Sequence, residues 1–375
     1  MNCEEFREKW EDYVEGKCPR EVEREIEQHL HTCTDCEEWV NEKLEQQTKD
    51  PRQNVAIPEL SYEQQQQIFR YAKWKNRFMN AVTVLGIFFC ISIASYIITA
   101  VYYAFAGHTA NKVIQTAIQM TMPNVYSHYG VTNTKVFFNA DLQGNLYKSL
   151  GNEEKYVGEY QGKMTFEFLN LKREWVDGQY DKKLYFLHPE LAKEESYDSN
   201  DTWHTLNMLP EGTVSELAVS FDDVYTFEEV YEILDEYDLD IVWYAIDTGI
   251  DEDFSYWGIH EEGVDSLLDE EERELDDVKG ESIEKEKAFK NGLELINKHK
   301  RYAKKVVWGL DEKIIIEEII DYVDQNGVKT YGVVVTGPTK ELLKLKENEQ
   351  IYYATLGEVD FWNWYTRERS GAIAR

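Results

Sequence analysis

Four of the five cysteines lie in the first 36 residues, close to a histidine, at a spacing that suits metal binding. His29, Cys33 and Cys36 stand at i, i+4 and i+7, so on a helix they share one face, and a short turn between the two cysteines would also bring them together. Zinc prefers four thiolate and imidazole ligands in a tetrahedron. The spacing therefore predicts a zinc site that needs one more ligand.

The fourth ligand is either Cys3 or Cys18. Cys3 opens an amphipathic segment that begins with Phe6, and this segment can fold back beside His29. Cys18 stands in a Gly-Lys-Cys-Pro sequence that is typical of a turn. We favour Cys3. His31 points to another face of the same helix and is expected to be solvated.

The elements that carry this site are followed by a long apolar segment. Residues 78–111 contain no charged side chain, and the densest part, 81–105, would form a helix about 37 Å long. A bilayer core needs about 20 such residues. The segment begins too far along the chain for a cleaved signal peptide. We expect one transmembrane helix over 79–106.

The charges beside this segment predict its orientation. Residues 67–78 hold four basic residues and no acid, whereas only Lys112 follows closely on the other side. Positive charge stays in the cytoplasm, which puts 1–78 inside the cell and 106–375 outside. The cysteines before the span then lie on the reducing side, where metal or redox roles are more common than structural disulfides.

The N-terminal motif resembles a known family. His29-x3-Cys33-x2-Cys36, with Cys3 26 residues upstream of the histidine, is similar to the zinc-binding anti-sigma domain over residues 1–48. The resemblance implies a helical bundle that binds an extracytoplasmic-function sigma factor and keeps it from RNA polymerase. It also implies that Cys3, His29, Cys33 and Cys36 hold one zinc ion. We favour a structural zinc over a redox switch.

A linker and a juxtamembrane helix are predicted between this domain and the span. Residues 49–60 contain two prolines and read as a linker. Ser61 and Gln64 form a capping-box pattern that opens a helix over 61–78, which would continue into the span. In the anti-sigma family that the N-terminal motif resembles, a helix after the linker clasps the sigma factor. The alternative is a plain stalk.

The external part is predicted to mix helices and strands. Within 107–204, the stretch 155–171 is expected to form a hairpin that turns at Gln161-Gly162. Within 205–365, strand, helix and strand follow one another twice, which predicts an α+β or α/β layer. The acidic stretch 251–285 is expected to be a solvated loop.

This external part resembles a second family. Residues 205–365 look like the C-terminal sigma-factor regulator domain, and 67–200 look more loosely like its N-terminal partner domain, which includes the membrane helix. These domains accompany single-pass anti-sigma proteins in Gram-positive bacteria. The expected fold class is therefore multidomain, with an N-terminal all-α zinc-binding bundle, one transmembrane helix and an extracytoplasmic α+β region.

Charge and motifs exclude other classes. The net charge of −32 argues against direct binding of nucleic acid, since a basic surface is needed to neutralise phosphates. The chain has no Gly-x-Ser-x-Gly and no His-Glu-x-x-His motif, so we expect no enzyme and no catalytic residues. The external histidines are expected on the surface or satisfied in the core; they are His128, His188, His204 and His260.

Together these features predict a membrane-anchored anti-sigma factor that releases its sigma factor on an envelope signal. The lipid bilayer is its second partner, and a membrane protein or a protease could take part in release. The alternative is a single-pass surface receptor or enzyme whose cytoplasmic zinc bundle docks another partner. Binding of a sigma factor by residues 1–78 would distinguish the two.

Overall fold

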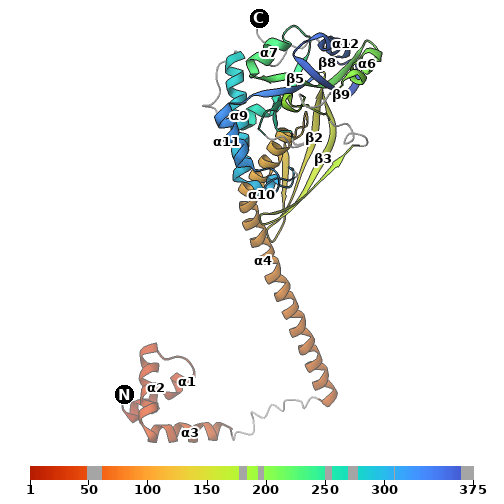
Figure 1. Ribbon diagram of the computed structural model, residues 1–375. Helices are drawn as coiled ribbons and strands as arrows, with labels where there is room; N and C mark the ends of the chain where they lie inside the picture. Colours follow the sequence, from red (N-terminus) through yellow and green to blue (C-terminus); the bar gives the residue numbers. More distant parts are fainter. Residues whose placement is uncertain are drawn as a thin grey trace. The chain divides into compact units, whose positions relative to one another are not determined.

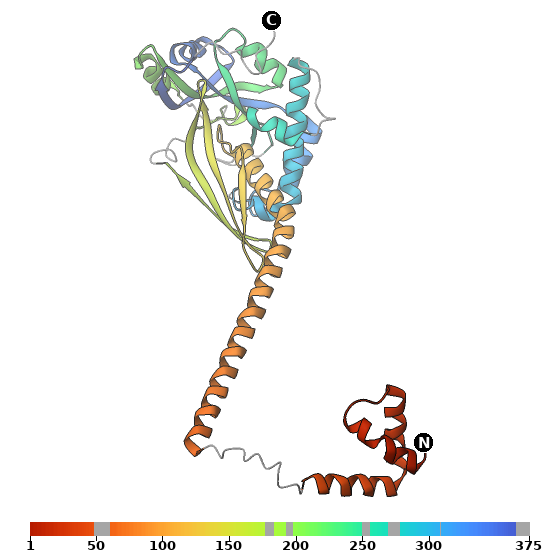
Figure 2. The same cartoon turned by 180° about the vertical axis from the view of Figure 1, so that it is seen from behind.

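The chain divides into two compact units, Met1–Leu85 and Gly86–Arg375 (Figures 1 and 2). The computed structural model describes residues 1–48, 61–176, 184–192, 198–249, 256–268, 278–307 and 309–364.

The N-terminal region consists of three short helices, α1 (Cys3–Val14), α2 (Arg20–Thr32) and α3 (Thr34–Thr48). A capping box starts α1. The Asn2 side chain accepts hydrogen bonds from the backbone N–H groups of Glu4 and Glu5, at 3.1 and 2.9 Å, and the Glu5 carboxylate accepts one from the Asn2 N–H. Such a box satisfies N–H groups that the helix leaves unpaired.

The hydrophobic core of these helices is small. Its fully buried members are Phe6, Ile26, Cys36 and Val40. Domains of about 40 residues or fewer usually need a metal, a disulfide or a partner in addition to their core. The bundle is therefore of a size at which a metal ion would add substantially to stability.

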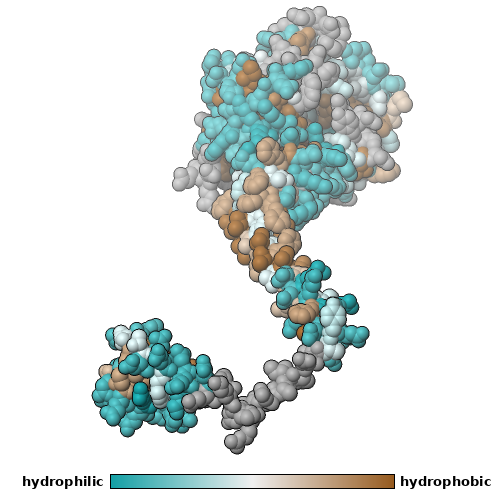
Figure 3. All heavy atoms as spheres, turned by 90° about the horizontal axis from the view of Figure 1, so that it is seen from below, coloured by the Kyte–Doolittle hydropathy of each residue, from teal (hydrophilic) through white to brown (hydrophobic). Residues whose placement is uncertain are grey.

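A single helix of 60 residues, α4 (Tyr62–Thr121), follows. It starts with the expected capping box, in which the Gln64 N–H donates to Ser61 Oγ and the Ser61 N–H donates to Gln64 Oε1, at 3.3 and 3.1 Å. Within the described part of the chain it is the one helix long and apolar enough to cross a membrane, and its most apolar window is entirely unburied. Figure 3 shows this apolar segment as a brown surface on the helix.

The last part of α4 has a different environment. The helix continues beyond residue 106, and side chains of its final turns are buried, among them Ala110, Val113, Ile114 and Ala117. They belong to the main core of the second unit. One helix thus provides both the membrane segment and a core element of the domain that follows.

The first sheet is an antiparallel meander of four strands, β1 (Gly130–Thr134), β2 (Asn139–Leu150), β3 (Glu153–Thr165) and β4 (Phe168–Trp175). The predicted turn at Gln161-Gly162 is wrong, because both residues lie inside β3 and pair with β2 and β4. Gly162 serves packing: a Cβ there would come within 2.9 Å of the Leu169 side chain. The real hairpin turns at Phe166 and Glu167, since Thr165 pairs with Phe168.

The second sheet has five strands in the order β7-β6-β8-β5-β9, and all neighbouring strands are antiparallel. Its strands are β5 (Thr213–Tyr225), β6 (Asp240–Ile246), β7 (Gly258–His260), β8 (Thr330–Pro338) and β9 (Ile351–Phe361). Helix α7 (Phe227–Leu234) connects β5 to β6, and α12 (Thr339–Lys344) connects β8 to β9. Each connected pair is parallel with one strand between its members, which is the split β-α-β arrangement of ferredoxin-like sheets.

The remaining helices pack around these two sheets. They are α5 (Pro189–Ala192), α6 (Asn200–Met208), α8 (Val264–Leu267), α9 (Val278–Lys298), α10 (Lys300–Ala303) and α11 (Ile316–Asn326), with 3-10 turns at Glu261–Gly263 and Leu345–Glu347. The acidic stretch 251–285 is not a simple solvated loop. Residues 250–255 and 269–277 lie outside the described residues, but between them β7 is buried, with Trp257 and His260 almost inaccessible.

These elements confirm the expected fold class: N-terminal helices that carry the Cys/His group, one long apolar helix and a region with both helices and sheets. The two sheets are joined through a buried ion pair. Lys148 Nζ of β2 lies 3.1 Å from both carboxylate oxygens of Glu216 in β5, and both side chains are almost fully buried. The Asn124 amide and the Glu358 N–H donate to the same carboxylate, at 2.7 and 3.0 Å.

Candidate metal centre

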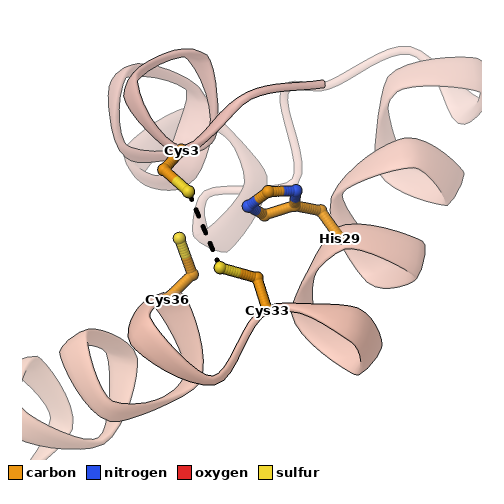
Figure 4. A group of neighbouring side chains, drawn as sticks. All are labelled: Cys3, His29, Cys33 and Cys36. Carbon is orange, nitrogen blue, oxygen red and sulfur yellow. Dashed lines mark hydrogen bonds between the residues drawn. The ribbon is translucent and has the colours of Figure 1, made fainter.

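The structure brings together the four residues singled out as zinc ligands (Figure 4). Cys3 is the first residue of α1, His29 lies in the last turn of α2, and Cys36 lies in the first turn of α3. Cys33 stands between α2 and α3 in an extended conformation. Their candidate ligand atoms all lie within 4.8 Å of one another.

The distances suit a tetrahedral ion rather than a disulfide. Cys3 Sγ and Cys33 Sγ are 3.6 Å apart, far longer than a disulfide bond of about 2.05 Å. Two sulfurs bound to one tetrahedral zinc, each at about 2.3 Å, lie about 3.8 Å apart. The arrangement of the thiols therefore fits zinc without a change of the backbone.

The histidine supports the same interpretation. His29 Nε2 is buried and has no hydrogen-bond partner within the described residues, which is a costly state for a polar atom unless something binds it. Figure 4 shows one ring nitrogen turned toward the sulfurs. The ring packs beside Phe6 at a centroid distance of 5.2 Å, which holds its orientation. The donor set thus fits one zinc ion held at the meeting point of α1, α2 and α3.

Two of the thiols have different electrostatic environments. Hydrogen bonds from the backbone of Cys36, and then from the Cys3 thiol, lower the pKa of Cys33. Burial, followed by the hydrogen bond with Cys3, raises the pKa of the Cys36 thiol to about 12. Zinc binds the thiolate form, so a bound ion would hold the buried Cys36 deprotonated.

The other residues weighed for this site lie elsewhere. Cys18 is half-buried outside the group, and its thiol approaches only the Lys9 carbonyl oxygen, at 4.0 Å. His31 is exposed on α2, as expected. Of the two open choices for the fourth ligand, the structure places Cys3 with the others, while the assignment of all four as ligands stays a prediction.

The external histidines form no comparable group within the described residues. His260 is buried and contacts Asn124 Oδ1 at 3.3 Å, and His128 Nε2 lies 2.9 Å from Glu154 Oε1. His204 is exposed. His188 accepts a hydrogen bond at Nδ1 from the Glu190 N–H, while its buried Nε2 has no hydrogen-bond partner within the described residues and lies 3.5 Å from Asp247 Oδ1. The expectation of surface or satisfied core histidines therefore holds for His128, His204 and His260 and only in part for His188.

Comparison with known proteins adds three family matches. Residues 3–36 match the putative zinc-finger family, 66–155 the sigma factor regulator N-terminal family and 206–358 the sigma factor regulator C-terminal family. The chain is also 29% identical over 386 residues to the probable anti-sigma-M factor YhdL of Bacillus subtilis (strain 168), covering 97% of this chain and 100% of the relative. No solved structure matches the chain.

Proposed function

We propose that this chain, which has the domain composition of a zinc-finger anti-sigma factor, holds an extracytoplasmic-function sigma factor inactive and releases it on an envelope signal. The observation that carries the proposal is the combination in one chain of the zinc-finger family with both sigma factor regulator families. The relative from Bacillus subtilis, which matches along nearly the whole chain, bears an anti-sigma name. The anti-sigma role itself rests on these matches, and the kind of sigma factor is our proposal.

The zinc ion would act as a structural support. Cys3, His29, Cys33 and Cys36 would hold it, and bound zinc ties three helix ends to one point. Since the core of α1, α2 and α3 is small, this tie is what keeps their outer faces in a fixed arrangement. Those faces would form the binding surface.

The charge of the N-terminal region suits such a partner. Residues 1–50 contain 16 acidic and 7 basic side chains. Sigma factors must approach DNA, so their surfaces carry positive charge, and an acidic inhibitor would be steered toward them. The name of the relative specifies a sigma-M factor, and a sigma factor of that type is the partner we would test first.

The start of α4 would add a second contact. Its exposed apolar side chains before the span include Tyr62, Ile68, Phe69, Tyr71 and Trp74. Scattered exposed apolar residues are ordinary, but a run of large ones on one helix marks an interaction site. Residues 61–78 would cover the sigma factor together with the zinc bundle, as a clasp on the cytoplasmic side of the membrane.

The external unit would report on the envelope. We place residues 106–375 outside the cell because the basic residues lie before the span. A signal received there, from a ligand, a membrane protein or a protease, would weaken the grip of the cytoplasmic part. The protein acts by binding and has no catalytic step of its own.

The test is binding and silencing. Full-length protein, solubilised from membranes with zinc present, is expected to retain a co-expressed sigma-M-type factor and to silence a reporter from its promoter. Cys3→Ser should reduce both effects, and Cys18→Ser, the matched control outside the site, should leave them unchanged. If the wild-type chain with zinc bound retains no sigma factor, the proposal fails, and the alternative of a single-pass surface receptor or enzyme is favoured.

A further inference from the structure

Two hairpin turns of the external unit reach α4 at residues that belong to its apolar segment. At the β1–β2 turn, the Phe137 N–H donates to Ser95 Oγ at 2.8 Å and the Phe138 N–H donates to Thr99 Oγ1 at 3.0 Å. Figures 1 and 2 both show the narrow end of the four-stranded sheet lying against this helix. The contact is far from the helix end at Thr121, where the domain core lies.

The length of the helix gives the level of these contacts relative to a bilayer. The last charged residue before the span is Arg77. From Phe78 to Ser95 the helix rises about 25 Å, and from Phe78 to Thr99 about 31 Å, at about 1.5 Å per residue. The hydrocarbon core is about 30 Å thick. If the hydrocarbon core begins at Phe78, its opposite boundary therefore falls between Ser95 and Thr99, the two residues that the β1–β2 turn contacts.

The second turn lies at the same place. Tyr103 Oη donates to the carbonyl oxygens of both Phe138 and Phe166, at 2.7 and 3.1 Å. The Phe138 and Phe166 rings stack with centroids 4.5 Å apart. We call the residues 136–138 and 166–168 the hairpin tips. Both tips are thus joined to each other and to α4.

The hydroxyl groups on α4 satisfy backbone groups of the tips. Ser95, Thr99 and Tyr103 stand four residues apart and so line one face of the helix. Ser95 and Thr99 accept from the Phe137 and Phe138 N–H groups, and the Tyr103 hydroxyl contacts the Phe138 carbonyl oxygen, which also accepts from the Phe166 N–H. Water would do this at a solvated turn, whereas at the edge of the hydrocarbon core such partners must come from the protein.

The tips expose apolar side chains. Phe168 is 80% exposed. Phe166, Phe137 and Val136 are 47%, 46% and 37% exposed. Hairpin turns are usually polar, and exposed aromatic residues grouped at one level are typical of a bilayer interface.

The backbone makes this choice of residue more unusual. Phe137, Phe138 and Phe166 have φ of 55°, 54° and 53°, a region that favours glycine and asparagine and is an outlier for bulky side chains. Glycine would serve the turns better. Phenylalanine at three such positions indicates that the ring itself is needed there.

A basic segment lies beside the tips. Glu167, the acid within a tip, forms an ion pair with Arg301 of α10. Residues 297–305 carry five basic side chains and no acid in an otherwise acidic chain. Lys300 pairs with Asp311 and Glu317, and Lys304 pairs with Asp311. Lys305 is exposed.

We propose that the hairpin tips insert their aromatic side chains into the outer leaflet of the bilayer beside α4, with basic residues of α10 near the lipid phosphates. The external unit would then be seated on the membrane at two additional points and held at a fixed angle to its own span. The leaflet named here rests on the proposed orientation of the chain, while the insertion itself does not depend on sigma-factor binding.

The test compares the accessibility of single introduced cysteines in the full-length protein, in phospholipid nanodiscs. The chain has no cysteine after Cys90, so Phe168→Cys adds one thiol to the external unit. The matched controls are Tyr129→Cys and Phe361→Cys, since these residues are 84% and 86% exposed, like Phe168. Labelling by a membrane-impermeant maleimide is followed by mass spectrometry of the separate peptides.

We expect the cysteine at position 168 to react at least about tenfold more slowly than both controls, because a charged reagent cannot enter the hydrocarbon boundary, and to react equally after denaturation. The protein alone leaves this position open, so slow labelling reports cover by lipid. Labelling as fast as at positions 129 and 361 would overturn the proposal. It would leave the anti-sigma function untouched, since that is read from sigma-factor retention.

Discussion

At the scale of residues, the identity of a few side chains sets the chemistry of the N-terminal region. The candidate ligands of the metal centre come from three helices, and the buried Nε2 of His29 has no other partner within the described residues. Soft thiolates with one imidazole select zinc over calcium or magnesium. Cys18 is near these residues in the sequence, but it lies outside the group.

The ligand assignment predicts how zinc content changes on substitution. Cys3→Ser is expected to lower zinc from about one ion per chain to a small fraction after mild chelation, because three ligands hold the ion more weakly than four. Cys18→Ser should retain its zinc. Metal analysis of purified protein after dialysis against a chelator measures both. The reverse result would move the fourth ligand to Cys18.

A second residue-scale prediction concerns the buried His260. Complete burial, and then the charge of His128, lower its pKa from 6.5 to about 3. The unfolded chain therefore binds a proton that the folded chain rejects, and stability falls as the pH drops below 6.5 toward 3. Between pH 7 and pH 5, His260 therefore lowers the free energy of unfolding by about 2 kcal/mol.

Denaturant unfolding of the purified protein at pH 7 and pH 5 checks this loss. In His260→Gln the difference between the two pH values should shrink by about 2 kcal/mol, whatever the stability of the variant at pH 7. His204→Gln, at an exposed position of α6, serves as the control and should behave as the wild type. An unchanged pH dependence in His260→Gln would contradict the assignment.

At the scale of elements, α4 combines roles that the sequence suggested separately. Its start carries a capping box and exposed aromatic residues, its middle is apolar and unburied, and its end is buried in the external core. The described part of the chain shows no proline or break within this helix.

The orientation of α4 can be tested with reporter fusions. Alkaline phosphatase joined after Arg375 is expected to be active, since this enzyme folds outside the cytoplasm, and the same reporter joined after Phe78 should be inactive. The cause is the basic run Arg70, Lys73, Lys75 and Arg77. Changing all four to Gln should lower the active fraction of the first fusion. Activity of the Phe78 fusion alone would reverse the topology.

At the scale of the whole molecule, the charge divides unequally. Residues 1–78 hold 18 acidic and 12 basic side chains, and residues 79–375 hold 54 and 28. Most of the net charge of −32 thus belongs to residues 79–375 and says little about the N-terminal zinc-finger region. Within that unit the two sheets meet across a buried ion pair, Lys148 with Glu216.

Removing one member of this pair should loosen the external unit. Glu216→Ala leaves the Lys148 ammonium buried without a counter-charge and should lower the free energy of unfolding by about 3–5 kcal/mol. Glu341→Ala removes a surface pair with Lys344 and should cost less than about 1 kcal/mol. Denaturant unfolding measures both. Adding Lys148→Met to Glu216→Ala should recover part of the loss; a double variant as unstable as the single one would contradict the pairing.

Much of this protein follows from local sequence. The zinc spacing, the apolar span, the capping boxes at Ser61 and Thr226 and the strands β5, β6, β8 and β9 are all set by neighbours in the chain, through helix periodicity, alternation and side-chain chemistry. The positive-inside rule likewise uses only nearby residues, although the orientation it gives stays a prediction.

Tertiary structure decided what depends on contacts between distant residues. Gly162 looked like a turn residue, but it lies within β3, where it pairs with Leu142 and Leu171. The turn falls at Phe166 and Glu167, although Phe166 has a positive φ that turn rules assign to glycine or asparagine. The burial of β7 within an acidic stretch, the Lys148–Glu216 pair and the contact of the hairpin tips with Ser95 and Thr99 are equally non-local. Local sequence determines which elements form, whereas packing across the fold determines where they turn and what they touch.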